Sequence, residues 1–118
     1  MKLKSNQLRL LPGVAAAAGL MALTTLAFGD GPGWTVNSTV QKLVVIADGG
    51  VNVRLSPELG NCASQGGYGP NYASIYASHP GINRIKADLL TAYLSGARVS
   101  LYLSDTNCKV TEIVLGGW

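Results

Sequence analysis

The chain has very few of the residues that perform catalysis or hold metals. It contains one histidine, His79, and two cysteines, Cys62 and Cys108, which are not in a Cys-x-x-Cys spacing. A catalytic triad needs a nucleophile beside its histidine, and a metal site needs several ligands at workable spacing. The sequence therefore predicts no catalytic residues, no metal site and no cofactor, and His79, which precedes Pro80, is interpreted as a turn residue.

Paired acids and a phosphate-binding loop are also missing. The acids outside the N-terminal region stand singly on expected turns, loop, helix and last strand, at Asp48, Glu58, Asp88, Asp105 and Glu112. Nothing in the sequence indicates a glycosidase-type carboxylate pair. The glycine-rich run at 66–70, GGYGP, lacks the lysine and the strand-to-helix context of a phosphate loop. We therefore expect a protein that is not an enzyme.

The N-terminal region predicts export. Met1–Arg9 is basic and has no acid, Leu10–Leu26 is almost wholly apolar, and the small residues Ala27 and Gly29 follow. This order is typical of a secretory signal peptide over 1–29, with cleavage after Gly29 or alternatively after Ala27. A retained membrane anchor is the other interpretation, but the run is interrupted by Pro12-Gly13 and is shorter than the about 20 residues that span a bilayer. We expect a secreted or periplasmic protein with no membrane span after cleavage.

An excess of positive charge is absent once the signal peptide is removed. The formal charge of +3 belongs to the first residues, because six basic and six acidic residues remain from Asp30 onward. Binding to nucleic acid requires a surplus of Lys and Arg that neutralises phosphates. The sequence therefore predicts no nucleic-acid partner.

The two cysteines are expected to form a disulfide. A small mature chain has a marginal hydrophobic core, and export delivers its thiols to an oxidising compartment. A bond between Cys62 and Cys108, which are 46 positions apart, would stabilise the fold by about 4 kcal/mol in the chain-entropy model.

Hydrophobic periodicity predicts three strands before residue 80. Residues 30–39 lack periodicity and are interpreted as a flexible lead, which includes a glycosylation-type sequon at 37–39. Val40–Ala47 and Val51–Ser56 are expected to form a β-hairpin through Asp48-Gly49-Gly50. A long loop follows over 57–71 and holds Cys62, and Tyr72–Ala77 is the expected third strand.

The clearest pattern lies at 82–103, where the apolar residues change from helical spacing to the alternation of a strand. Apolar residues recur at helical spacing, with an expected core face of Ile82, Ile85, Leu89, Ala92 and Tyr93. Asn83 is the expected N-cap and Gly96 the expected left-handed residue after the helix. Strands are expected at Arg98–Ser104 and Lys109–Leu115. The prediction is one α+β domain over 40–118, mostly β, either a five-stranded OB-like barrel or a curved sheet, with one helix between strands 3 and 4.

Strand alternation predicts a binding face on the side away from the core. Tyrosine rings combine flat apolar area with a polar tip, and Arg and Asn supply hydrogen-bond donors. The nearby loop, through Gln65, Tyr68 and Asn71, is expected to flank this face. The predicted binding residues are Asn52, Arg54, Tyr72, Tyr76, Arg98 and Tyr102.

The second half of the chain resembles small exported bacterial proteins with an LL-x-A helix, a Gly turn, a V-x-L-Y strand, a cysteine and an I-x-L strand. Here these features are Leu89–Ala92, Ser95-Gly96, Val99–Tyr102, Cys108 and Ile113–Leu115. Their order is similar to that of the oligosaccharide-binding-fold B subunits of subtilase cytotoxin and pertussis-like toxins. The resemblance implies a five-stranded barrel, a homo-oligomeric ring and a glycan ligand, although none of the sugar-binding residues of those toxins matches a position here.

Two functions follow as expectations. The first is a secreted, non-enzymatic domain that binds a cell-surface glycan or glycoprotein, as a toxin B subunit does. The alternative is a periplasmic or envelope structural or inhibitory protein that binds a protein partner.

Overall fold

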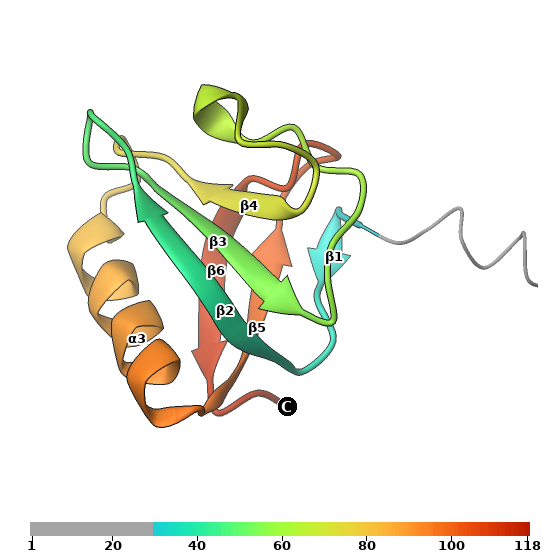
Figure 1. Cartoon of the computed structure of the whole chain (residues 1–118), viewed down its shortest axis with the longest axis vertical. Coiled ribbons are helices and arrows are strands. Elements are labelled where there is room, and N and C mark those ends of the chain that lie inside the picture. Colours follow the sequence, from blue (N-terminus) through green and yellow to red (C-terminus); the bar gives the residue numbers. More distant parts are fainter. Residues whose placement is uncertain (1–29) are drawn as a thin grey trace, which may run out of the picture.

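The computed structural model describes residues 30–118. The predicted signal peptide and both cleavage positions lie outside these described residues. Figure 1 shows a curled sheet with one helix packed beside it. The elements are β1 (Gly33–Trp34), β2 (Ser38–Val45), β3 (Val51–Ser56), the 3₁₀ helix η1 (Gln65–Gly67), β4 (Tyr72–Ile75), α3 (Ile82–Ser95), β5 (Arg98–Leu103) and β6 (Val110–Leu115).

The sheet is a partly closed barrel of the OB-like type. β2, β3 and β4 follow one another as antiparallel neighbours, and β5 pairs with β2. β1 and β2 share one edge of β5, while β6 occupies the other edge. A parallel bridge between Ser74 and Lys109 then brings β4 to the start of β6. The predicted fold class and the position of the helix between the third and fourth predicted strands are confirmed.

Inward-facing residues of the strands form the core, as the alternation predicted. Val51, Val53 and Leu55 of β3 are 0–1% exposed, and Val99 and Leu101 of β5 are fully buried. The predicted hairpin is present, since β2 and β3 are joined through the turn at 47–49. In β6 the buried residue is Val110 at its beginning, and Ile113 is partly buried against the core.

Helix α3 packs on the core with part of its predicted face. Ile85, Leu89 and Ala92 are buried, but Tyr93 is 47% exposed, so its assignment to the core face was wrong. Figure 1 shows α3 beside β2, with β6 behind β2. The helix ends at Gly96 as predicted, because Gly96 has φ 76° and its N–H donates to the Ala92 carbonyl at 2.9 Å.

The start of α3 differs from the prediction. Gly81 is the N-cap, the helix begins at Ile82, and Asn83 is an exposed helical residue. His79 organises this turn: its Nδ1 accepts from the Gly81 N–H at 2.9 Å, and its Nε2 is 2.9 Å from the Thr111 carbonyl oxygen. The imidazole thus fixes the turn that leads into the helix, and no side chain caps the first helical turn.

The segment 30–39 is part of the sheet rather than a free lead. β1 pairs with β5, and Thr35 exchanges hydrogen bonds with Leu101 at 2.9 and 3.0 Å. The Asp30 carboxylate accepts hydrogen bonds from the backbone N–H groups of Gly60 and Asn61. A two-residue strand carries no readable periodicity, so the sequence could not reveal this pairing.

The predicted disulfide is present. Cys62 and Cys108 are bonded with a sequence separation of 46. The bond ties the loop over 57–71 to the turn before β6. Within residues 30–118, no helix has the length and apolar character needed to cross a membrane.

Candidate functional site

Asn52 points away from the core as predicted but is buried beneath the loop. Its exposed fraction is 0%. Its Nδ2 donates to the Gln65 carbonyl at 2.9 Å, and its Oδ1 accepts from the Ser74 hydroxyl at 2.7 Å. Gln65 continues the network by donating from Nε2 to the Ile75 carbonyl at 2.9 Å. Asn52 therefore holds the loop on the sheet, and its assignment to a solvent-facing binding surface was wrong.

Tyr72 is also removed from the predicted binding face. It is only 9% exposed, and the ring of Tyr68 from the loop packs against it edge to face with centroids 6.1 Å apart. Of this pair, Tyr68 is the exposed ring, at 48%. The alternation of β4 gave the correct side of the strand, but not the loop that covers that side.

Arg54 remains accessible and is paired with an acid. Its Nε donates to Glu58 Oε2 at 2.6 Å, and its Nη2 donates to the same oxygen. This hydrogen bonding and the charge of Glu58 raise the pKa of Arg54 above its usual value. Arg54 and Glu58 line an open hollow on the outer face of β2 and β3.

Tyr76 lies at a separate place, after β4. The ammonium of Lys109 is 5.5 Å from the centroid of its ring, a cation–π distance. The same neighbourhood contains His79 and Thr111, which are hydrogen-bonded to each other. Tyr76 and Lys109 thus help hold the turn before α3 against β6.

Arg98 and Tyr102 lie on the outer face of β5, where Tyr102 belongs to an aromatic cluster. Trp34 of β1 is directly opposite Tyr102, with ring centroids 5.3 Å apart and planes at 69°. Trp118 also packs against Trp34, with ring centroids 5.3 Å apart and planes at 88°. Trp34 is 40% exposed and Trp118 is 73% exposed. We call Trp34, Tyr102 and Trp118 the aromatic cluster.

Asn37 fixes Trp118 in the aromatic cluster. Its Oδ1 accepts the Trp118 N–H at 2.7 Å, and its Nδ2 donates to the Trp118 carbonyl oxygen at 2.8 Å. The same Oδ1 accepts from the Ser100 hydroxyl at 3.0 Å. Gly117 is required for this approach, because a Cβ at this position would lie 2.7 Å from Asn37 Oδ1. The backbone of Trp118 is therefore anchored while its ring stays exposed.

Charged groups border the aromatic cluster. Arg98 is exposed on the same face of β5 as Tyr102, and its Nη1 donates to the Asn37 carbonyl at 3.5 Å. Glu112 is exposed on β6, directly opposite Tyr102 in the register. The arrangement offers exposed ring surface together with a cation, an anion and their hydrogen-bonding capacity.

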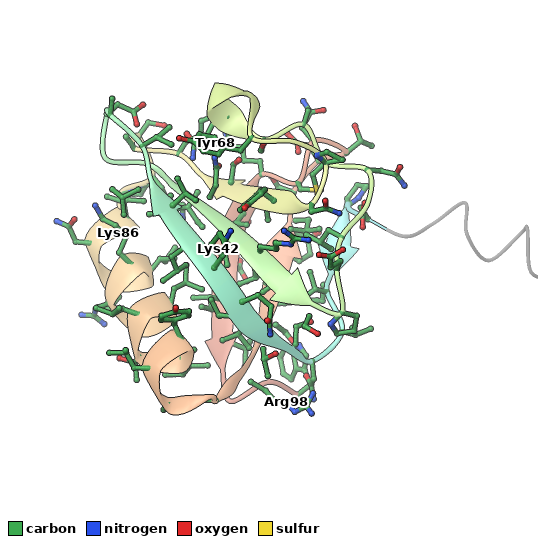
Figure 2. All side chains as sticks on the ribbon, viewed as in Figure 1. Lys42, Tyr68, Lys86 and Arg98 are labelled. Atoms are coloured by element: carbon green, nitrogen blue, oxygen red, sulfur yellow. A yellow bond between two sulfur atoms is a disulfide. The ribbon has the colours of Figure 1, made fainter. Side chains whose placement is uncertain are left out.

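The six predicted residues do not form one surface. Asn52 and Tyr72 are covered, Arg54 pairs with Glu58, and Tyr76 lies beside Lys109. Figure 2 shows Tyr68 and Arg98 at opposite ends of the molecule.

The sequence interpretation missed both tryptophans. Trp34 was placed in the flexible lead, and Trp118 follows the last predicted strand and was given no role. Both lie next to glycines and outside any periodic segment. A tryptophan outside every predicted helix and strand has no predicted place in the core. This was the signal in the sequence that could have indicated a surface site.

Within residues 30–118, the one grouping of three metal-type ligand atoms is formed by Asp30, Cys62 and Cys108. Both sulfurs are consumed in the disulfide, so neither is a thiolate that could bind a metal. In the comparisons with known proteins, no family model, curated protein or solved structure matches this chain.

Proposed function

We propose that the protein is a secreted, non-enzymatic binding domain that recognises a cell-surface glycan or glycoprotein through the aromatic cluster. The observation that carries this proposal is the exposure of Trp34 and Trp118 in a cluster whose backbone is fixed by hydrogen bonds. The resemblance of the sequence to toxin B subunits and the OB-like fold agree with it.

The chemistry of the cluster suits a sugar. A pyranose ring has apolar C–H faces, which pack on aromatic rings, and hydroxyl groups, which need hydrogen-bond partners. Here the rings are bordered by Arg98 and Glu112, which supply donors and acceptors. Because Asn37 already fixes the Trp118 backbone, less conformational freedom is lost on binding than on a mobile chain end.

Glycan-array binding of the purified protein tests this function. We expect a defined set of glycans to bind, and Trp118→Ala to weaken binding about tenfold, since loss of one well-placed aromatic contact costs about 1.4 kcal/mol. Arg98→Ala is expected to weaken binding as well, because it removes a donor at the border of the cluster. Tyr93→Ala is the control, as it removes an exposed aromatic ring from α3, outside the aromatic cluster. No glycan signal from the folded protein, or an equal loss in Tyr93→Ala, would refute the proposal.

The second candidate function, a structural or inhibitory protein that binds a protein partner, is favoured by a different surface. Val45 of β2 and Leu90 and Leu94 of α3 are 62%, 50% and 74% exposed. Exposed apolar groups of this kind are typical of protein contacts. If this candidate is correct, Leu94→Asp abolishes a defined complex that Trp118→Ala leaves intact, as measured by light scattering with the isolated partner. If the protein binds a glycan and forms no complex with a protein partner, this second candidate is wrong.

A further inference from the structure

Two cations face each other on the outer side of β2 and β3. Lys42 and Arg54 are direct partners in the antiparallel register, so their side chains leave the sheet on the same face. Figure 2 shows Lys42 over these two strands, and it is exposed. Like charges in directly opposed positions repel each other. This is an unfavourable arrangement unless an anion lies nearby.

One acid relieves only part of this repulsion. Glu58 forms an ion pair with Arg54, and it is the only ion pair within 4.0 Å among residues 30–118. Lys42 therefore has no acidic partner in the described part of the chain. The two cations and Glu58 together leave one positive charge on this surface.

A β-bulge directs a further polar side chain to the same place. The register moves from Val40 opposite Leu55 to Lys42 opposite Arg54, so Gln41 is the extra residue. Bulges re-aim side chains and are frequent beside binding sites. As a result, the consecutive residues Gln41 and Lys42 are both exposed and both line one hollow.

The hollow has the size and lining of a small-ligand site. Its volume is about 430 Å³, and it is open to solvent. Five of its six lining residues carry charged or hydrogen-bonding groups, two of them cations and one an acid, which suits a charged and hydroxylated ligand. The lining residues are Gln41, Lys42, Arg54, Leu55, Ser56 and Glu58.

We propose that this hollow binds the anionic group of an acidic sugar, a carboxylate or a sulfate ester. Lys42 and Arg54 are the cationic partners of the anion, and Gln41 and Ser56 bind the neighbouring hydroxyl groups. The site goes beyond the proposed function: its residues are different from those of the aromatic cluster, and it binds whether or not the cluster has a ligand.

Two-dimensional amide NMR during titration tests the site. The probes are glucuronic acid and glucose 6-sulfate, with glucose as the neutral control and sodium acetate and sodium sulfate as free anions. We expect saturable shifts at the amides of 41, 42, 54–56 and 58 with both acidic sugars, and weaker binding as sodium chloride is added. Competition by free sulfate or acetate supports recognition of the charge. Equal shifts with glucose, or shifts spread over the whole surface, would overturn the proposal.

Charge variants separate binding from a structural role. Lys42→Gln is expected to weaken binding of both acidic sugars, and Glu58→Gln to strengthen it, each by about two- to fivefold, the effect of one exposed charge pair. Arg84→Gln is the matched control, since it removes one exposed positive charge from α3. Weaker binding in Glu58→Gln, or the same loss in Arg84→Gln as in Lys42→Gln, would contradict the site. Trp118→Ala should leave this binding unchanged, so failure here is distinct from failure of the aromatic cluster.

Discussion

At the scale of single residues, Asn52 shows how a polar side chain serves the fold. The two-residue alternation of β3 correctly placed the Asn52 side chain on the other side of the sheet from Val51 and Val53. Alternation identifies a side of the sheet, but it does not tell whether another segment covers that side. The loop covers it here, so Asn52 makes hydrogen bonds to Gln65 and Ser74 in place of water.

Asn52→Ala is therefore expected to destabilise the protein by about 1–3 kcal/mol, because it leaves buried partners without a hydrogen bond. Urea unfolding followed by circular dichroism measures the change. Asn83→Ala is the matched control, since Asn83 is exposed on α3 and has no capping role. Equal stability of Asn52→Ala and the wild type would show that the network does not hold the loop.

The candidate site was only partly predictable at this scale. Arg98 and Tyr102 were correctly placed on one side of their strand. Trp34 and Trp118 join them from segments that are distant in sequence and carry no period. Their meeting depends on the pairing of β1 with β5 and on Asn37, which are contacts that no local pattern encodes.

At the scale of elements, hydrophobic periodicity predicted the helix and the five longer strands, because each is long enough to show a repeat. β2 to β6 and the helix lie within two residues of the expected bounds. β1 has two residues and was missed. The helix start was misassigned because Asn83 has a side chain of the capping type, whereas the helix begins after Gly81, in a turn that the His79 imidazole fixes, with no side-chain cap.

The buried face of α3 gives a prediction for this element. Leu89→Ala is expected to lower the free energy of unfolding by about 2–5 kcal/mol, because Leu89 is 0% exposed in the core. Leu94→Ala, the same chemical change on the same helix at a 74% exposed position, should change it by less than about 0.5 kcal/mol. Thermal and urea unfolding compare the two, and similar losses would mean that α3 does not pack as described.

At the scale of the whole molecule, a small core is supported by a covalent tie. The disulfide joins the loop that covers β3 and β4 to the turn before β6. The sequence predicted this bond from two cysteines and a predicted export signal. It did not predict what the tied loop would do, which is to bury Asn52 and Tyr72 and so leave the exposed chemistry to the hollow and the aromatic cluster.

Cys62→Ser with Cys108→Ser is expected to lower the free energy of unfolding by about 4 kcal/mol, as expected for a loop of 46 residues. Urea unfolding measures the loss. A reducing agent should have the same effect on the wild type and none on the double variant. A wild type unaffected by complete reduction would exclude a stabilising role for the bond.

The central claim is that the aromatic cluster binds a glycan, and tryptophan fluorescence tests it most directly. The chain has two tryptophans, and both lie in the cluster, so emission reports this site alone. Titration with a neutral glycan selected on the array should give a saturable change in emission, with the same dissociation constant as calorimetry. Binding of this neutral glycan seen by calorimetry with no change in emission would contradict the account.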